Sequence, residues 1–403
     1  MRFFTFHYMS FQGVTPEVLD ENVVSWGTLP NSACDPERLS RDYRNYIDQA
    51  SLADRLGFDG VAVNEHHMTP FGTMPNPNVM AAAITQRTER ARIAVLGNAL
   101  ALRKTPLSSI EEYSMLDLLS GGRMEAGFVV GGGPEFYSFG QNPTEARDRF
   151  AEALTLARRA WTEPGPFRFD GRYYALDCVN PWPRPLQQPH PPVWVCGVGS
   201  PPTLEMCARE GLNYMGVNFH TATDEFQKQC EYFRDKAEEY GREYDPNSIG
   251  WLAAVHVAET DEQARAEYLE HAAYSHSLAA GFIGNSKTFF PPGHMPPDKL
   301  AGWERHARAV ALGETERGPD MSIVGSPETC RRLLTDRLRA FEIGNVVMGF
   351  QVGNMPHDVA SRSMTLFAEV VMPAVRSEID EFLDGKYPNR TNATAPVPVE
   401  ASA

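Results

Sequence analysis

The feature of this sequence that most limits its fold is the regular alternation of short apolar segments with longer amphipathic ones. The short segments are rich in Val, Ala and Phe, which is typical of parallel strands buried on both faces. The longer segments repeat their apolar residues at helical spacing. The eight predicted strands span residues 2–8, 60–64, 92–100, 123–131, 192–198, 213–219, 248–259 and 345–351.

Each predicted strand is followed by at least one predicted helix. The first helix is well marked, because Asp35 can cap its start, Pro36 suits its first position and Gly57 can end it. Eight strand–helix units predict an α/β fold, a (β/α)8 TIM barrel. An open doubly wound sheet is the alternative, and eight well-formed units favour the barrel over it. The predicted helices span residues 34–57, 76–90, 106–122, 144–162, 201–211, 223–241, 260–280, 326–342 and 358–376.

The chain of 403 residues is expected to form one barrel domain over residues 1–380, with two long insertions. Residues 9–34 follow the first strand, so they lie on the face where barrel active sites are built. Residues 281–321 follow a helix, yet they are long enough to fold back over that face. Such long loops are usually lids or binding loops. The polar tail, residues 384–403, is expected to be disordered.

The charge balance narrows the range of partners. The formal net charge is −15, which argues against binding to nucleic acid or to an anionic membrane. No run of 18 apolar residues and no signal-peptide pattern occur, so a cytoplasmic location is expected. The six cysteines follow no metal-binding spacing and are expected to be reduced thiols.

The segment Glu65-His66-His67 follows the second predicted strand directly. In a barrel this position is the catalytic rim, so we expect at least one of the three side chains to be functional. Neighbouring residues of an extended segment point to opposite sides, so one imidazole should face the centre while the other braces the loop. A purely structural histidine is the alternative. A catalytic metal is less favoured, because no third ligand appears at a matching spacing.

A glycine-rich turn joins the fifth predicted strand to its helix, in "VWVCGVGSPPT" (193–203). Glycines let a backbone approach a ligand, and a helix N-terminus carries free N–H groups. The hydroxyls of Ser200 and Thr203 could add to a phosphate site. Pro202 stands where a dinucleotide fingerprint needs its third glycine. The segment therefore predicts a mononucleotide phosphate site, with a plain helix cap as the alternative.

Small residues also end the third and fourth predicted strands. Gly97, Asn98 and Ala99 lie in the third, and three glycines follow the fourth in "GFVVGGGPEFYSFG" (127–140). Small side chains at neighbouring strand ends would leave a flat slot for a bulky planar ligand. A tight loop is the simpler interpretation of the glycines.

Several of these segments together resemble the bacterial luciferase-like flavin-dependent monooxygenases. They are "GFDGVAVNEHHMTPFG", "SGGRMEAGFVVGGG", "GLNYMGVNF" and "GNVVMGFQVGNMPHDVASRSMTLFAEVVMPAVR", and the resemblance runs in order over residues 1–377. It implies a (β/α)8 flavoprotein enzyme, commonly a dimer. Such an enzyme takes reduced FMN from a separate NAD(P)H:flavin reductase. The reduced FMN reacts with dioxygen to a flavin peroxide, which oxygenates a small organic substrate.

The resemblance also implies roles for particular residues. His66 corresponds to the usual catalytic histidine of the family's Glu-His motif, and Glu65 would lie near the isoalloxazine ring. A non-proline cis peptide, which often supports the ring at the end of strand three, would be expected near Ala99-Leu100. The cofactor phosphate would bind at Gly199, Ser200 and Thr203.

One departure from the family pattern concerns the end of strand four. Luciferase-type members carry a Cys-Arg pair there, with the arginine reaching the phosphate, whereas this chain has Val129-Val130 before Gly131. Val130 and Gly131 are still expected to border the cofactor. The phosphate charge would then be met by backbone N–H groups and hydroxyls, or by another cation such as Arg103 or Lys104.

The chemistry implied by the resemblance has physical requirements that the sequence can meet. Reactive oxygen adducts need a dry site, which the insertions 9–34 and 281–321 could cover. Histidine titrates near neutral pH and can take or return a proton. Three alternatives stay open: a deazaflavin-dependent oxidoreductase of the same superfamily, a non-catalytic flavin-binding partner subunit and a metal-dependent hydrolase.

Overall fold

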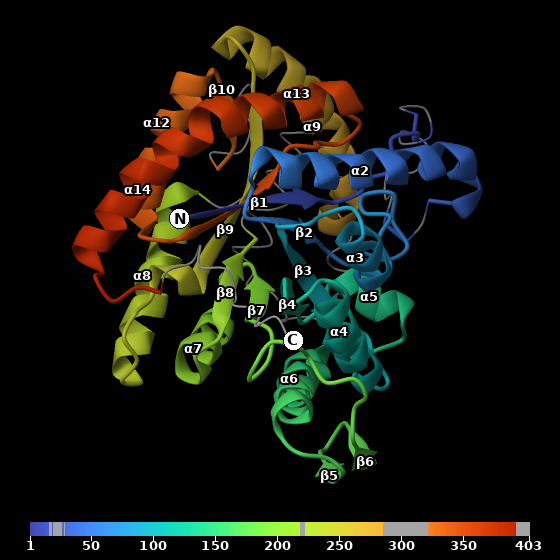
Figure 1. The fold of residues 1–403 in the computed structure, drawn as a ribbon. Helices are drawn as coiled ribbons and strands as arrows, with labels where there is room; N and C mark the ends of the chain where they lie inside the picture. Colours follow the sequence, from blue (N-terminus) through green and yellow to red (C-terminus); the bar gives the residue numbers. More distant parts are fainter. Residues whose placement is uncertain (16–17, 19–25, 28, 218–221, 285–320, 392–403) are drawn as a thin grey trace, which may run out of the picture.

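The computed structural model contains a closed barrel of eight parallel strands (Figure 1). The strands neighbour one another in the order β1-β2-β3-β4-β7-β8-β9-β11, and β11 pairs with β1 to close the ring. This confirms the predicted TIM barrel, and each predicted strand contains one barrel strand. The structure describes residues 1–391 apart from 16–17, 19–25, 28, 218–221 and 285–320. The barrel strands are β1 (Arg2–His7), β2 (Gly60–Val63), β3 (Arg92–Ala99), β4 (Met124–Val129), β7 (Val193–Gly197), β8 (Asn213–Gly216), β9 (Ile249–Val257) and β11 (Asn345–Gly349).

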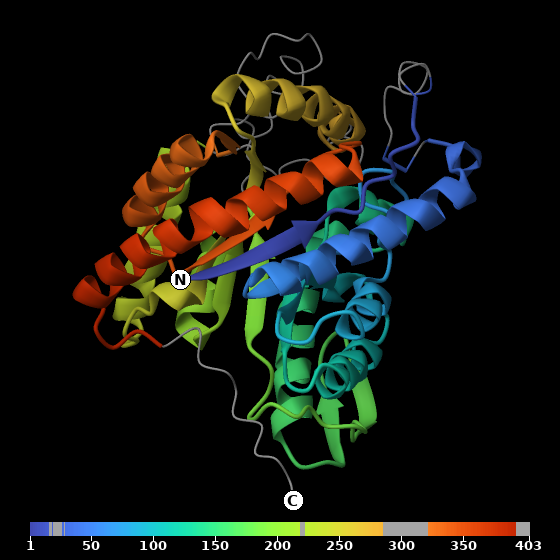
Figure 2. The same ribbon diagram turned by 45° about the horizontal axis from the view of Figure 1, so that its top comes forward.

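Helices surround the barrel on its outside (Figure 2). The first begins and ends as predicted, because Asp35 accepts hydrogen bonds from the backbone of Glu37 and Arg38, and Gly57 has a left-handed φ of 83°. The last predicted helix is instead two helices joined by a π-helical turn, Phe367–Val371. The long helices are α2 (Pro36–Leu56), α3 (Pro77–Thr85), α4 (Leu107–Leu119), α6 (Ala146–Thr162), α7 (Pro201–Glu210), α8 (Thr223–Glu239), α9 (Asp261–Gly284), α12 (Pro327–Phe341), α13 (His357–Leu366) and α14 (Met372–Lys386).

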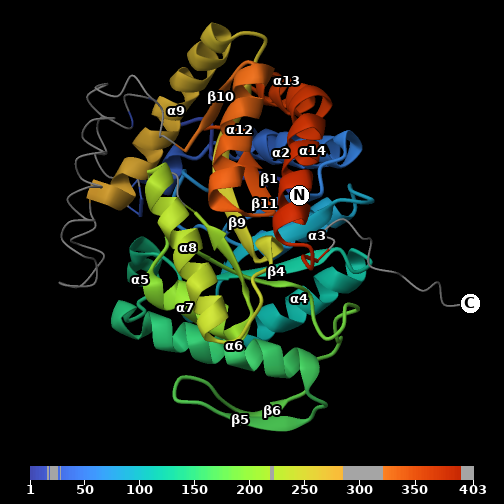
Figure 3. The same ribbon diagram turned by 90° about the vertical axis from the view of Figure 1, so that its left-hand side faces the viewer.

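Besides single 3-10 turns, three strands and one α-helix of the described residues were not predicted from the sequence. A hairpin of β5 (Phe167–Asp170) and β6 (Ala175–Val179) lies outside the barrel next to α6 (Figure 3). The short strand β10 (Ile323–Gly325) pairs with the end of β9. The six-residue helix α5 (Gly133–Ser138) follows β4. These elements are too short, and the hairpin too exposed, to show a clear apolar period.

The first residues of the segment 384–403, which was predicted to be disordered, are instead structured. Helix α14 continues to Lys386. Thr391 then bonds the side chains of Asp245 and Asn247. Its carbonyl accepts from Asn247 at 2.7 Å as well. Residues 392–403 and most of the second predicted insertion lie outside the described residues, and α9 includes the first four residues of that insertion.

The bottom of the barrel, where the strands begin, is closed by a buried ionic network. Glu125 of β4 points inward with 1% of its side chain exposed, and Arg2 donates to its Oε1 at 2.8 Å. Arg92 also bonds Oε1, and Trp194 Nε1 donates to Oε2 at 2.6 Å. Burial alone would raise the pKa of Glu125, but the charges of Arg2 and Arg92 hold it below the ordinary value. Both carboxylate oxygens of Glu125 are therefore bonded within the protein.

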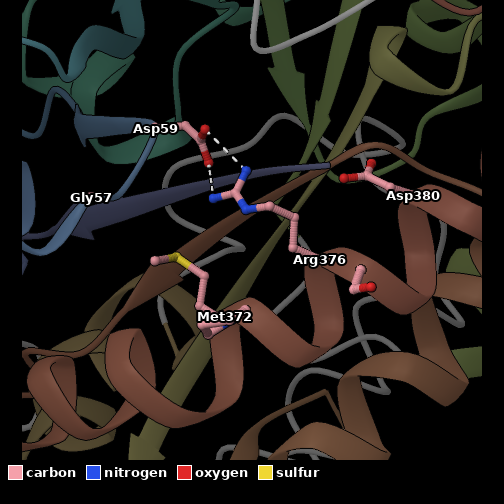
Figure 4. Close-up of a pocket in the computed structure, with 7 residues that line it drawn as sticks. Gly57, Asp59, Met372, Arg376 and Asp380 are labelled. Atoms are coloured by element: carbon pink, nitrogen blue, oxygen red, sulfur yellow. Dashed lines mark hydrogen bonds and ion pairs between the residues drawn. The ribbon is translucent and has the colours of Figure 1, made fainter.

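A shallow recess on the same face is lined by residues of α14 and of the turn before β2 (Figure 4). Arg376 reaches from α14 to Asp59, with its Nη2 2.9 Å from Oδ2. Asp59 also accepts from the Phe3 backbone at 2.7 Å. Arg376 donates to the Met1 carbonyl at 2.6 Å. The arginine and Asp59 therefore fasten α14 to the first two strands, and we treat the recess as structural.

Among the described residues, no helix is long and apolar enough to cross a membrane. The same part of the chain holds no group of three His, Cys, Asp or Glu side chains placed to bind a metal ion.

Candidate active site

Glu65 lies at the mouth of the barrel and is fully engaged by its neighbours. Its Oε1 is 2.7 Å from His67 Nε2, and its Oε2 accepts from Arg103 at 2.8 Å. The Ala99 backbone donates to the same oxygen at 3.2 Å. Only 1% of the Glu65 side chain is exposed. Glu65 therefore ties the end of β2 to the end of β3.

His66 points elsewhere and stays partly accessible, with 22% of its side chain exposed. Its ring lies among three aromatic rings, with centroid distances of 5.1 Å to Trp26, 5.5 Å to Phe71 and 6.2 Å to Tyr8. The two neighbouring imidazoles thus do different things, in line with the alternation predicted from the sequence. His67 braces the loop, and His66 is the imidazole that a ligand can reach.

A buried carboxylate orients His66. Its Nδ1 lies 3.3 Å from Oε1 of Glu135, which is 5% exposed and comes from α5. A proton on Nδ1 would be donated to Glu135, which leaves the Nε2 lone pair for a ligand. Gly72 makes room for the ring, because a Cβ there would lie 2.8 Å from His66 Cδ2. Sequence reasoning missed Glu135, although an acidic residue just after three glycines at a rim was a usable signal.

The end of β3 carries a non-proline cis peptide, but not where it was expected. It joins Leu96 and Gly97, three residues before the predicted Ala99-Leu100. The pairing of β3 with β4 shifts register between Val95 and Asn98, so the irregularity lies inside the strand. Ala99 and Leu100 themselves are buried in the apolar cluster that includes the outer helices. Any cofactor contact of theirs must come from the backbone.

Glycines allow close packing at the ends of β3 and β4. A Cβ on Gly97 would lie 2.8 Å from the backbone of Phe128. Gly131 has a φ of +110°, and a Cβ there would lie 3.1 Å from the Phe136 ring. Val130, beside it, is half-buried. These glycines permit close packing within the protein, and the flat slot expected from the small residues stays a prediction.

The turn before α7 brings together two of the three residues predicted to bind phosphate. Ser200 Oγ and Thr203 Oγ1 are 2.8 Å apart. Gly199 has a φ of +83°, and its N–H already donates to Tyr214 Oη at 2.8 Å. Since Pro201 and Pro202 have no N–H, this helix start offers few backbone donors. Hydroxyl groups, not the Gly199 amide, are the donors available here.

A cation that the sequence reasoning missed lies at this turn. Arg147, in the first turn of α6, donates from Nη1 to Ser200 Oγ at 3.3 Å and to Thr203 Oγ1 at 3.2 Å. Arg103, one of the two predicted cations, is instead engaged by Glu65 and by Asn98 Oδ1 at 3.1 Å. Arg147 lies 53 residues from Ser200 in the chain, so no local motif marks it.

The sequence matches the luciferase-like monooxygenase family over residues 23–342. The chain belongs to this family of flavin-dependent monooxygenases. One relative is the oxygenase component of a flavin-dependent trigonelline monooxygenase from Acinetobacter baylyi, 26% identical over 86% of this chain and 94% of that protein. Another is the alkanal monooxygenase alpha chain of Photorhabdus luminescens, 26% identical over 81% of this chain and 90% of that one.

Solved structures support the same fold. The monooxygenase RslO1 from Streptomyces bottropensis superposes with a TM-score of 0.72 at 25% identity, over 93% of this chain and 99% of that one. The oxygenating constituent of 3,6-diketocamphane monooxygenase from Pseudomonas putida, solved with FMN, gives 0.66 at 17%, over 93% and 98%. An F420-dependent secondary alcohol dehydrogenase gives 0.65 at 18%, over 93% and 99%.

Proposed function

We propose that this protein is the oxygenase component of a two-component monooxygenase. It would use reduced FMN and dioxygen to oxygenate a small organic substrate. The observation that carries the proposal is His66, a partly exposed imidazole held by the buried Glu135 at the mouth of a barrel. Family membership and the two-component trigonelline relative support it.

The residues present fit the phosphate end of FMN. The hydroxyls of Ser200 and Thr203 with the guanidinium of Arg147 form a donor set for a phosphate. The small residues at the ends of β3 and β4, among them Gly97 and Gly131, would border the planar ring. Bound reduced FMN would supply the activation of dioxygen.

The side chains around the mouth would control protons and water. His66, oriented by Glu135, can take a proton from a group at Nε2 or return one. Tyr8, Trp26 and Phe71 surround His66 with apolar surface that excludes water. Burial raises the pKa of Tyr8 well above its ordinary value, so its phenol stays neutral. Glu65 would act by position, because its oxygens are bonded within the protein.

We further propose that the partners are an NAD(P)H:flavin reductase and a second copy of this chain, in the cytoplasm. The adjacent helices α3 and α4 expose four large apolar side chains, between 44% and 68% accessible: Val79, Met115, Leu118 and Leu119. Light scattering of the wild type should give a dimer mass. Leu119→Glu should shift it to the monomer, and Leu269→Glu, at an exposed leucine of α9, should leave it unchanged.

Anaerobic titration with reduced FMN, followed by stopped-flow mixing with dioxygen, tests the proposed function. The wild type should bind reduced FMN, and the bound FMN should reoxidise more slowly than free FMN in solution. A transient absorbance should appear during the reaction. His66→Ala should bind equally well and lose the transient. Failure to bind, or reoxidation at the rate of free FMN, would reject the proposal. Tight binding of a deazaflavin with no sensitivity to dioxygen would establish the deazaflavin-dependent alternative instead.

A further inference from the structure

Asn64 is a buried polar side chain at the barrel mouth that no part of the proposed function uses. It directly follows β2, and alternate residues of a strand point the same way. Ala62, two residues earlier, belongs to the apolar cluster inside the barrel. Asn64 therefore points inward, one layer closer to the mouth.

The pairing register identifies the neighbours of Asn64. His7 of β1 and Val95 of β3 both pair with Val63. The next residues, Tyr8 and Leu96, therefore flank Asn64 on the two sides, and both contact the interior cluster. The asparagine amide thus lies in otherwise apolar and aromatic surroundings, which suit the face of a planar ring.

The Asn64 amide oxygen lacks a partner. The residue is 7% exposed, and Oδ1 accepts no hydrogen bond from the described residues. A buried acceptor without a donor destabilises a folded protein, so such a group calls for a partner, and a ligand in the mouth can supply the donor. The Cβ–Cγ torsion of asparagine has a broad energy profile, so the amide can turn its oxygen toward a ligand.

A second asparagine at the same rim shows that an amide oxygen at the rim need not lack a hydrogen-bond partner. Asn98 of β3 is 0% exposed, and its Oδ1 accepts from Arg103 at 3.1 Å. Its Nδ2 donates to Asn78 at 2.9 Å and lies 3.3 Å from Tyr113 Oη. Asn98 has a structural role with both ends of its amide bonded, whereas Asn64 has an oxygen left over.

We propose that Asn64 is a ligand-binding residue whose Oδ1 accepts a hydrogen bond from a ring N–H of a planar ligand in the barrel mouth. The isoalloxazine ring and a heteroaromatic substrate both offer this chemistry. The cofactor source rests on the proposed function, whereas the binding of a ring N–H does not. The near-isosteric Asn64→Leu removes the acceptor and keeps the volume.

Two matched probe pairs distinguish the sources. The first is reduced FMN against its N3-methyl analogue, titrated anaerobically. The second is 2-pyridone against N-methyl-2-pyridone, followed by ligand-observed NMR and calorimetry. Losing one hydrogen bond should weaken binding roughly three- to tenfold in the wild type. We call this factor, the affinity for the N–H ligand divided by that for its N-methyl analogue, the ratio of the pair. Asn64→Leu should bring the ratio of the flavin pair toward one if the cofactor is the donor. It should bring the ratio of the pyridone pair toward one if the substrate is the donor.

Ratios that are the same in wild type and Asn64→Leu for both pairs would overturn the proposal. Thermal unfolding provides the control for folding: Asn64→Leu should melt at or above the wild-type temperature, and Asn98→Leu should melt below it. A lower melting temperature for Asn64→Leu, with unchanged ratios, would make Asn64 structural. If wild-type protein does not bind reduced FMN, the proposed function fails, while the pyridone pair still tests Asn64.

Discussion

Each end of the barrel buries a glutamate, and different sets of partners bind the two carboxylates. Glu125 at the bottom and Glu65 at the mouth both have side chains that are 1% exposed. Glu125 meets two guanidiniums and an indole. Glu65 meets one guanidinium, an imidazole and a backbone N–H. Around Glu65, however, the Asn64 amide oxygen stays unpaired and His66 stays accessible.

The difference assigns the bottom of the barrel to stability and its mouth to function. A completed polar network rigidifies the bottom. Polar groups at the mouth that lack a hydrogen-bond partner destabilise the fold unless a ligand supplies that partner. Changes at the bottom should therefore alter the free energy of unfolding, and changes at the mouth should alter ligand binding and turnover.

The largest effect is expected from Glu125→Gln. It leaves Arg2 and Arg92 buried without their anion, which should lower the free energy of unfolding by about 3–5 kcal/mol. Urea denaturation followed by circular dichroism measures it. Equal free energies of unfolding for wild type and Glu125→Gln at pH 7 would contradict the stabilising role assigned to the bottom of the barrel.

The pH dependence of wild-type stability follows from the same glutamate. Its folded pKa lies below the ordinary value, so its stabilisation is complete above the unfolded pKa of about 4.3. That stabilisation is lost as the pH falls through the folded value. The stability gap between wild type and Glu125→Gln should therefore narrow in acid, as measured by urea denaturation at a series of pH values.

The second prediction concerns the mouth. Glu135→Ala removes the partner that orients His66 and should slow the dioxygen-dependent step by less than the 10²–10⁴-fold typical of losing a catalytic acid or base. Stopped-flow kinetics measure this rate. Glu135→Asp should recover part of it, and the affinity for reduced FMN should not change. A large loss of affinity would instead give Glu135 a role in cofactor binding.

The third prediction uses ligands with and without a phosphate. Arg147→Ala should weaken FMN binding roughly tenfold and leave riboflavin binding unchanged, since charged hydrogen bonds are the stronger ones. Fluorescence titration of both flavins measures the two affinities. The control is Arg158→Ala, which lies on the same helix as Arg147 and loses only a surface pair with Glu210 of α7. Val130→Arg should restore the affinity for FMN in the Arg147→Ala background. Equal losses of affinity for FMN and riboflavin in Arg147→Ala would contradict the assignment of Arg147 to the phosphate.

The smallest effect is expected where the first insertion meets α9. Tyr274 Oη donates to the Phe11 carbonyl at 2.8 Å and accepts from Val14 N–H at 3.1 Å. Tyr274→Phe removes both bonds and should lower the free energy of unfolding by about 1 kcal/mol. Chemical denaturation measures it. Tyr268→Phe, also on α9, loses only one contact, with Ser322 before β10, and should cost less.

The barrel could be predicted because its signals are local. Apolar period and helix caps such as Asp35 and Gly57 act within a few residues, and the structure places both as predicted. The rim position of Glu65 and His66 followed from the fold class. Arg147 could not be found in this way, because its partners lie more than 50 residues away in the chain. Glu135 lies 69 residues from His66, and only the three glycines before it mark its position. The cis peptide was misplaced because the irregular pairing of β3 with β4 is set by both strands.

The closure of the barrel by β1 and β11 has a consequence for how the chain is made. Arg2 pairs with Asn345, and their side chains also bond across 343 residues. A ribosome releases the N-terminal strand long before its neighbour exists. Until β11 emerges, one edge of β1 stays unpaired, and exposed strand edges promote aggregation. The first strand of this protein therefore keeps one open edge until nearly the whole chain has been translated.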